Sequence, residues 1–166
     1  DYLTNVVRFS PGFMYLKDDR FCYLMCNKNF AEAAGLRHPD EIIGKTDYDL
    51  AWGDTHAELF RQGDGQVLSG VEKINFEEPQ LQADGQTRTV LANKVPLRDR
   101  SGKIIGILGN YVDITDRKSA EQELLEAKEQ AEIANRSKTE FIRNMEHDIR
   151  TPFSGLLGIS DILFEQ

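Results

Sequence analysis

The sequence predicts an α+β fold, in which an antiparallel five-stranded sheet with flanking short helices is followed by a long coiled-coil or dimerisation helix. Five β-prone runs, each bounded by turn residues, indicate the sheet. Short helical segments with capping residues lie between the second and third runs. Residues 1–112 hold most of the glycine, proline and aromatic residues, whereas residues 116–163 contain one proline and two glycines. This shift places the end of the globular domain near Val112 and predicts a long helix after it.

Turn residues separate the β-prone runs and indicate how they pair. Residues 18–20 (Asp-Asp-Arg) join the first two runs as a hairpin. Residues 83–85 (Ala-Asp-Gly) and 99–102 (Asp-Arg-Ser-Gly) supply the turns between the last three. Because these connections are short, we expect a largely antiparallel sheet. The runs are Phe13–Lys17, Phe21–Cys26, Val71–Gln80, Thr87–Pro96 and Lys103–Asp113.

The segment between the second and third runs carries helix caps and helix stops. Thr46 can cap the short turn after it, and Asp54 can cap a longer helix that ends before Ser69-Gly70. Gly35 and Gly44 are placed to end two other short helices. The expected segments are a short helix before the first strand, then Asn27–Ala34, Pro39–Ile43, Asp47–Leu50, and Asp54 to Val67 or Leu68.

Composition limits the class of protein. Hydrophobic residues make up 40% of the 166 residues, which is enough for a modest core. The net charge of −8 argues against nucleic acid as a partner. Since no run of about 18 apolar residues is present, we expect a cytoplasmic protein, with membrane association only through segments outside this chain. The first four residues contain neither an initiator methionine nor a signal peptide, so we expect an internal fragment.

The only cysteines are Cys22 and Cys26. On a strand these two would share one face, and no second ligand pair lies near them, so no metal site is expected. Reduced, partly buried thiols are the plain interpretation.

Beyond the globular domain, mostly apolar residues recur at alternating spacings of three and four positions, which is the pattern of a coiled-coil seam. The seam is rich in alanine and contains Lys138, so the coiled coil should be weak. A helix with one apolar stripe is marginal alone in water, and we therefore expect a parallel homodimer. A weak seam can change register or rotation when a sensor changes state, although a passive spacer helix is the alternative. The seam positions are Ala120, Leu124, Ala127, Ala131, Ala134, Lys138, Phe141 and Met145.

Near the C-terminus, residues 146–152 place a histidine and an acidic neighbour inside this helical run. His147 is about 200° around the helix from Met145, so it faces away from the apolar stripe. Thr151 follows four residues later and shares its face. Pro152 cannot donate a backbone hydrogen bond and should loosen or bend the helix there. The spacing predicts an exposed imidazole on a locally weakened helix.

These residue types suit phosphoryl transfer. A neutral imidazole nitrogen of His147 can attack the terminal phosphoryl group of ATP. The carboxylate of Asp148 can hold the ring in the useful tautomer and accept its other proton. Thr151 could orient a water toward the phosphohistidine in the reverse, phosphatase reaction. A surface histidine on a charged helix is the alternative for His147 taken alone.

The segment from Phe141 to Pro152, with Gly155–Gly158 after it, resembles the phosphoacceptor box of sensor histidine kinases, on the first helix of their dimerisation and histidine-phosphotransfer domain. The resemblance implies that His147 is autophosphorylated, that Asp148 assists transfer and that Thr151 supports phosphatase activity. The sequence departs from the usual small residue, glutamate and leucine at three positions. These are Glu146, Asp148 and Phe153.

The first domain has the order of two strands, several short helices and three strands, and it contains four short motifs. They are Gly44-Lys45-Thr46-Asp47, Val95-Pro96-Leu97-Arg98-Asp99, the strand Gly106–Asn110, and Asp113-Ile114-Thr115. With them, residues 8–115 resemble a PAS sensor domain. PAS domains sense small molecules, light, redox state or a partner in a pocket between the sheet and the helices, and the fold does not name the ligand or require one. The resemblance implies that Asp113 and Thr115 couple the last strand to the long helix.

Two PAS cofactors are not expected. A flavin-binding light sensor needs a reactive cysteine in an Asn-Cys-Arg context on the helical side, and the cysteines here fall on a predicted strand. A haem-binding sensor needs a proximal histidine on the longer helix, and His56 lies too near its start. Aromatic residues expected in the core or lining the pocket are Trp52, Phe60, Tyr48 and Phe76.

Three segments are therefore predicted: a sensor domain with a short N-terminal helix at 1–112, a coiled-coil signalling linker at 113–135, and a truncated phosphoacceptor helix at 136–166. The resemblance implies a sensor histidine kinase of a two-component system. In the intact protein, ATP with Mg²⁺ would bind a separate C-terminal domain, and the phosphoryl group of His147 would pass to an aspartate of a response regulator or receiver domain. This chain lacks a glycine-rich ATP lid and should not autophosphorylate alone.

Two alternatives stay open. One is a PAS-driven dimerisation scaffold whose histidine is never phosphorylated, against which the joint presence of His147, Asp148 and Thr151 argues. The other is a PAS-linked cyclase or other output enzyme, which would show a different motif after the coiled coil. The signal, the cognate regulator, upstream transmembrane segments, an additional receiver domain and the balance of kinase and phosphatase activity are not readable from the sequence.

Overall fold

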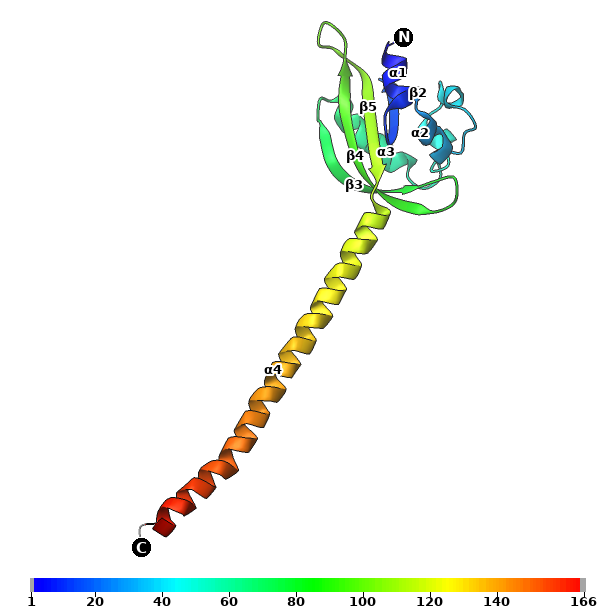
Figure 1. The fold of residues 1–166 in the computed structure, drawn as a ribbon. Coiled ribbons are helices and arrows are strands. Elements are labelled where there is room, and N and C mark those ends of the chain that lie inside the picture. The colour runs from blue at the N-terminus through cyan, green and yellow to red at the C-terminus, as the bar shows by residue number, and fades with distance from the viewer. Residues whose placement is uncertain (1, 165–166) are drawn as a thin grey trace. The chain divides into compact units, whose positions relative to one another are not determined.

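The computed structural model describes the backbone of residues 2–164 and the side chains of residues 4–150. Figure 1 shows a sheet with short helices, followed in the chain by one long helix. The α+β fold class predicted from the sequence is confirmed. The elements are α1 (Tyr2–Phe9), β1 (Phe13–Asp18), β2 (Tyr23–Cys26), α2 (Lys28–Ala33), η1 (Pro39–Ile42), η2 (Asp47–Asp49), α3 (Ala57–Leu68), β3 (Lys73–Leu81), β4 (Thr87–Arg98), β5 (Ile104–Asp113) and α4 (Thr115–Phe164), where η marks a 3-10 helix. The chain divides into two compact units, up to Arg117 and from Lys118 on.

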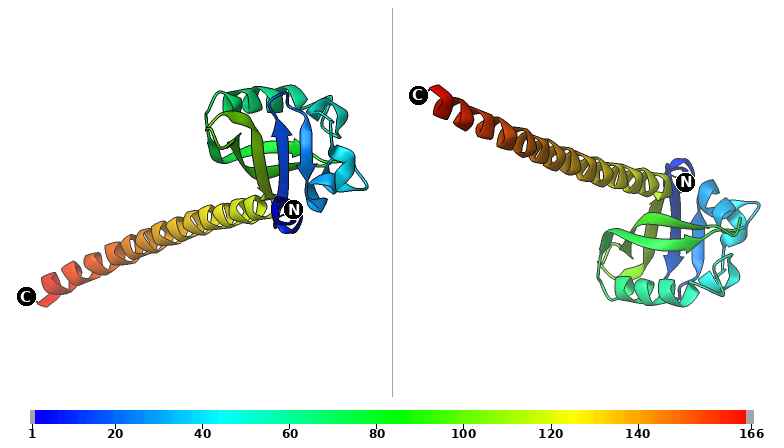
Figure 2. Two further views of the ribbon diagram at one scale, coloured as in Figure 1. Left: turned by 90° about the horizontal axis from the view of Figure 1, so that it is seen from above. Right: turned by 90° about the horizontal axis from the view of Figure 1, so that it is seen from below.

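The sheet has the strand order β2-β1-β5-β4-β3, and every neighbouring pair is antiparallel. The first and last strands of the chain therefore lie side by side in its middle, with Tyr15 opposite Gly109 and Lys17 opposite Ile107. Figure 2 shows α3 and the short helical segments between β2 and β3 on one side of this sheet. That arrangement encloses the core between the helices and one face of the strands.

Aromatic rings dominate this core. Phe30 of α2 lies at its centre, with ring centroids 4.8 Å from Tyr15, 5.5 Å from Tyr23, 5.6 Å from Trp52 and 6.0 Å from Tyr111. All five residues are buried. Tilted and edge-to-face ring pairs add to the free energy gained from burying apolar area. Phe30 therefore anchors the short helices to the sheet.

Local capping explains most of the short helices. The side chain of Asn27 accepts a hydrogen bond from the backbone N–H of Phe30 at 3.1 Å and begins α2. Gly35 follows α2 with φ +83°, a conformation that favours glycine. The expectation that Asp54 caps the longer helix is wrong, because α3 begins at Ala57. The backbone N–H groups of residues 55 and 56 instead bond to the carbonyl oxygen of Trp52.

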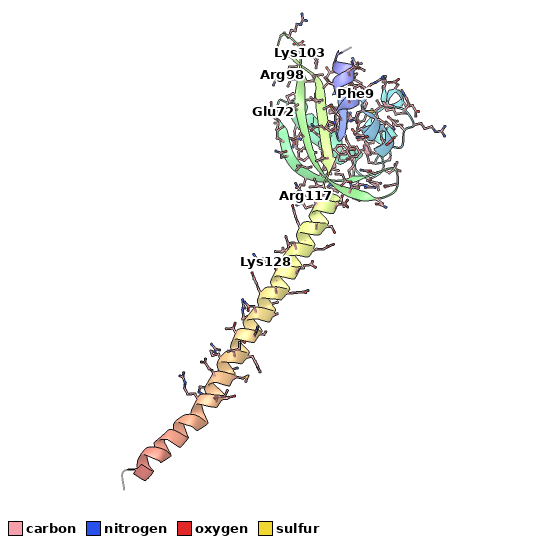
Figure 3. All side chains as sticks on the ribbon, viewed as in Figure 1. Phe9, Glu72, Arg98, Lys103, Arg117 and Lys128 are labelled. Atoms are coloured by element: carbon pink, nitrogen blue, oxygen red, sulfur yellow. The ribbon has the colours of Figure 1, made fainter. Side chains whose placement is uncertain are left out.

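The long helix α4 runs unbroken from Thr115 to Phe164. In the part whose side chains are described, they project from the helix all around, as those near Lys128 do in Figure 3. The predicted seam is open in this single chain, since Leu124 is 71%, Phe141 64% and Met145 46% exposed. The coiled coil and the homodimer stay predictions. Within the described residues, no helix is both long and apolar enough to cross a membrane.

Candidate functional site

The end of the sheet and the start of α4 are joined by a compact set of hydrogen bonds. Asp113 Oδ1 accepts from the backbone N–H and the hydroxyl of Thr115 at 2.9 and 2.6 Å. The Thr115 hydroxyl oxygen accepts from the backbone N–H of Thr89 at 3.0 Å. Arg88 lies 3.3 Å from Asp113 Oδ2 and 2.5 Å from Asp84 Oδ2. Although burial opposes it, bonding to Thr115 and Arg88 holds the pKa of Asp113 below its ordinary value.

A second set of polar groups lies inside the core. Lys17 of β1 is 1% exposed, and its Nζ lies 2.5 Å from Asp47 Oδ2 and 2.6 Å from Asp64 Oδ2. The other oxygen of Asp47 accepts from the hydroxyl of Tyr23 at 2.7 Å and from the indole N–H of Trp52 at 3.3 Å. Both oxygens of Asp47 are therefore partnered, as a buried carboxylate requires.

Lys94 of β4 is the second buried cation. Its Nζ lies 3.2 Å from Asp64 Oδ1 and 3.8 Å from Glu78 Oε1. Burial alone would raise the pKa of Asp64, but Lys17 and Lys94 hold it below its ordinary value. Glu78 behaves in the opposite way, because burial raises its pKa by more than Lys94 lowers it.

These charges border a small cavity of about 20 Å³ between the sheet and the helices. A space of this volume can hold one water molecule. Its walls combine aromatic rings with Lys94, Glu78, Gln80 and Asp47. The aromatic residues that line it are Tyr15, Tyr23, Phe30, Trp52, Phe60 and Tyr111.

His147 and Asp148 adjoin each other on the surface of α4. The Nδ1 of His147 lies 3.7 Å from Asp148 Oδ1, and both side chains are more than four-fifths exposed. The distance is too long for a hydrogen bond but suits electrostatic orientation of the ring. The side chains of Thr151 and Phe153, which were also singled out in the sequence, lie outside the described residues.

His147 also lies in a shallow groove on α4, with a volume of about 190 Å³. Each arginine that lines it is three or four positions from both Glu146 and His147, so the four side chains lie on one side of the helix. The apolar side chains of this region, Phe141, Met145 and Ile149, are on the other side. The lining residues are Arg143, Glu146, His147 and Arg150.

Comparison with known proteins agrees with this arrangement of sheet, helices and joint. Residues 8–119 match the family model described as PAS fold. The chain belongs to the PAS family. The match begins just before β1 and ends in the first turns of α4, so it contains both the core charges and the joint at Asp113 and Thr115.

Curated relatives of this PAS protein are sensors. The chain is 30% identical over 164 residues to the virulence sensor protein BvgS of Bordetella bronchiseptica, covering 98% of this chain and 13% of BvgS. It is 41% identical over 76 residues to hybrid signal transduction histidine kinase A of Dictyostelium discoideum, covering 46% of this chain and 3% of that protein. The chain thus spans a small part of these relatives. Its PAS domain has a signal-sensing role of the kind found in two-component systems.

Solved structures show the same fold. VqmA of Vibrio cholerae, in a complex with ligand and DNA, superposes with a TM-score of 0.63 and 26% identity, covering 69% of this chain and 51% of VqmA. VqmA bound to DPO superposes with a TM-score of 0.61 and 25% identity, covering 68% and 56%. The likeness supports the PAS fold assigned above.

The aromatic residues singled out in the sequence differ in their places. Trp52 and Phe60 line the core cavity, and Phe76 packs against the core cluster. The expectation for Tyr48 is wrong, because it is half exposed and its hydroxyl donates to Glu58 Oε2 at 2.7 Å. An aromatic ring can satisfy its hydroxyl at the surface as well as in a core.

The cysteines and His56 also have defined places. Cys26 is buried at the end of β2, and burial raises the pKa of its thiol to about 12. Cys22 lies in the turn before β2, not on the strand as expected. His56 precedes α3 and stacks on Phe60 with centroids 5.8 Å apart. Among side chains 4–150, no three histidine, cysteine, aspartate or glutamate residues are grouped as metal ligands would be.

Sequence reasoning missed the buried charges, although a signal for them exists. Lys17 and Lys94 occupy inward-facing positions of strands, where the period of two places apolar residues. Asp64 lies four residues after Phe60 and three before Val67, on the buried face of α3. Two lysines and an aspartate at core positions of different elements indicate an internal ion network, because charges are buried only with partners.

Glu78 should make the stability of the PAS domain depend on pH. Its ionised form is penalised by burial in the folded state, and the penalty disappears as pH falls through its raised folded pKa. The domain should therefore gain stability from this group as pH is lowered from a higher value, where Glu78 is ionised in both states, toward the ordinary pKa of glutamate, since the folded state binds more protons over that interval. Glu78→Gln should be more stable than wild type at the higher pH, with the difference shrinking at the lower. Urea unfolding at both pH values measures this.

The exposed Glu72 offers a matched control for that experiment. Glu72→Gln removes the same charge from the exposed residue just before β3 and should change stability little at either pH. A Glu78→Gln effect that is constant with pH would contradict the assignment of the titrating group.

Proposed function

We propose that this chain is the sensor and phosphoacceptor part of a sensor histidine kinase. The PAS domain controls ATP-dependent autophosphorylation of His147 and transfer of the phosphoryl group to an aspartate of a response regulator or receiver domain. The observation that carries the proposal is the contact of His147 with Asp148 on a helix that continues from the PAS joint. The likeness to a histidine kinase and to BvgS supports it.

The chemistry uses both ring nitrogens of His147. Nε2 attacks the γ-phosphorus of ATP, the bond from that phosphorus to the bridging oxygen breaks, and ADP leaves. Asp148, 3.7 Å from Nδ1, stabilises the positive charge that develops on the ring and takes up the Nδ1 proton. We assign ATP and Mg²⁺ to a separate domain, so that this chain supplies the acceptor. The kinase belongs in the cytoplasm, where ATP is available.

A homodimer is part of the proposal. Phe141, Met145 and Ile149 are each about half exposed or more in the single chain. Pairing with the same helix of a second copy would cover them. His147 lies on the opposite side and would stay accessible to the ATP-binding domain and to the regulator.

The input site in this proposal is the core cavity beside Lys94. VqmA has been solved bound to DPO, which supports a small molecule as the kind of signal. In this chain the cavity has room for one water, so a larger ligand would have to displace lining side chains. Such displacement would change the positions of β4 and β5. Thr89 of β4 donates to the hydroxyl of Thr115, and Asp113 at the end of β5 accepts from the same hydroxyl. The joint would then carry the change into α4.

Labelled ATP tests the proposal. A longer chain that continues through its ATP-binding domain is incubated with the label as wild type and as His147→Gln. The wild type should acquire acid-labile, base-stable label, and the variant should acquire none. A folded, dimeric wild type that stays unlabelled would refute phosphotransfer and favour a dimerisation scaffold.

A further inference from the structure

We propose that Arg143 is a positioning residue which, with Arg150, holds the phosphoryl group of phosphorylated His147, and that Glu146 weakens this hold. The inference rests on the proposed phosphorylation of His147 and adds the groups that set how long the phosphoryl group is kept. Its basis is the groove of about 190 Å³ that these four residues line on α4.

Helical spacing brings the four side chains together. Arg143 precedes His147 by four residues and Arg150 follows it by three, so both arginines are neighbours of the imidazole with Cβ atoms about 5–6 Å away. An arginine side chain is long enough to reach a group attached to Nε2 across that distance. The guanidinium is also the side chain best suited to bind two oxygens of a phosphoryl group at once.

The charges around His147 are unequal on its two sides. Asp148 faces Nδ1, whereas the groove beside the ring contains two guanidinium groups and the single carboxylate of Glu146. Glu146 is three residues from Arg143 and four from Arg150, so it neighbours both. Before phosphorylation Glu146 can partner the arginines. Afterwards the phosphoryl group, with its larger charge, competes for them.

In this arrangement Glu146 opposes binding of the phosphoryl group by the two arginines. It stands where histidine kinases commonly have a small residue, and its charge would repel a phosphoryl group on the adjacent histidine. The two arginines offset that repulsion. The balance between Arg143, Arg150 and Glu146 then sets the lifetime of the phosphohistidine before transfer.

Phosphoramidate allows a test on this chain, without an ATP-binding domain. The Nε2 lone pair attacks the phosphorus of phosphoramidate, the P–N bond to nitrogen breaks, and ammonia leaves with the proton released from the ring. ³¹P NMR then follows the phosphohistidine signal as it hydrolyses at physiological ionic strength, about 0.15 M. His147→Gln identifies the signal that belongs to this residue rather than to His38 or His56. Circular dichroism confirms that each variant keeps its helix.

Opposite charge changes should have opposite effects. The phosphohistidine of the Arg143→Gln variant should hydrolyse roughly two- to fivefold faster than that of wild type. In Glu146→Gln it should hydrolyse roughly two- to fivefold slower. These factors are the range expected for exposed charge pairs. Arg143→Lys should recover part of the lifetime, and its ³¹P shift should lie between those of wild type and Arg143→Gln. About 1 M salt should remove most of these differences, since it shortens the screening length to about 3 Å.

Arg136→Gln is the matched control. It removes a positive charge from the same helix, three turns before His147, and should leave the lifetime unchanged because about 16 Å exceeds the screening length in physiological salt. Equal lifetimes for wild type, Arg143→Gln and Glu146→Gln, or changes in the same direction, would overturn the inference.

The two proposals fail separately. If the longer chain is labelled by ATP on His147 but Arg143→Gln has no effect on the lifetime, the positioning role is wrong and the kinase assignment stands. If Arg143→Gln shortens the lifetime but ATP gives no label, the phosphoryl-binding groove is real and the kinase assignment is wrong.

Discussion

Replacing Lys17 by methionine should lower the free energy of unfolding of the PAS domain by about 3–5 kcal/mol, the usual cost of removing one partner from a buried ion network. Lys17 is bonded to Asp47 and Asp64, and both carboxylates are buried. Methionine has a similar length and no charge, so the variant keeps most of the packing and leaves two carboxylates without their shared cation. Lys94 stays 3.2 Å from Asp64 Oδ1, so Asp64 keeps one of its two ion pairs.

Urea unfolding followed by the fluorescence of Trp52, the single tryptophan, measures this loss. Lys28→Met is the matched control. It also replaces a lysine that is paired with a carboxylate, but here both partners are exposed, with Lys28 Nζ 3.6 Å from Glu32 Oε1. Its effect should stay below about 1 kcal/mol. A double variant in which Lys17 and Asp47 both become apolar should recover part of the loss, because Asp64 keeps its ion pair with Lys94. Equal losses in Lys17→Met and Lys28→Met would show that the core network does not stabilise the fold.

Replacing Gly106 by alanine should be nearly as damaging, with a loss of about 3 kcal/mol, at the upper end for overpacking. A Cβ at Gly106 of β5 would overlap the backbone carbonyl of Lys17 on the neighbouring strand. Backbone atoms cannot move aside as a flexible side chain can. The strand pair β1–β5 at the middle of the sheet would have to separate locally, and Lys17 would move with it.

Gly65→Ala is the control for this change. Gly65 lies within α3, and a Cβ there would meet nothing within 4 Å. Alanine should raise the free energy of unfolding by about 0.5–1 kcal/mol, because glycine weakens a helix interior. Thermal or urea unfolding of both variants gives the comparison. A harmless Gly106→Ala would mean that β1 and β5 are less closely packed than described.

The elements that could be predicted from the sequence are those set by neighbouring residues. Asn27 and Gly35 bound α2 through contacts within a few positions, and the turn at residues 83–85 joins strands that are adjacent in the chain. The exposed, adjacent placement of His147 and Asp148 was predictable for the same reason, because helical spacing alone determines it. The start of α3 was missed because the carbonyl of Trp52, held in place by burial of its ring, takes the backbone N–H groups that follow.

Contacts between distant residues could not be predicted in this way. Lys17 and Asp64 are 47 positions apart, and only the folded sheet and α3 bring them to 2.6 Å. Arg88 likewise meets Asp113 across 25 positions. Tyr48 was expected inside because it is aromatic, and its partner Glu58 places it at the surface. Residue type showed that these side chains could form such pairs, and the fold decides which pairs form.

The hydrogen bond between Thr89 and Thr115 limits where this PAS domain can be fused to the helix of another protein. The backbone N–H at the beginning of β4 has its acceptor in the first residue of α4 rather than in another strand. A chimera joined at Asp113 to a foreign helix without threonine at position 115 would leave that N–H without its acceptor. It would also remove the hydroxyl group with which Thr115 donates to Asp113 Oδ1. Chimeric proteins that carry this PAS domain should therefore retain its sequence through Thr115 and begin the foreign helix after that residue.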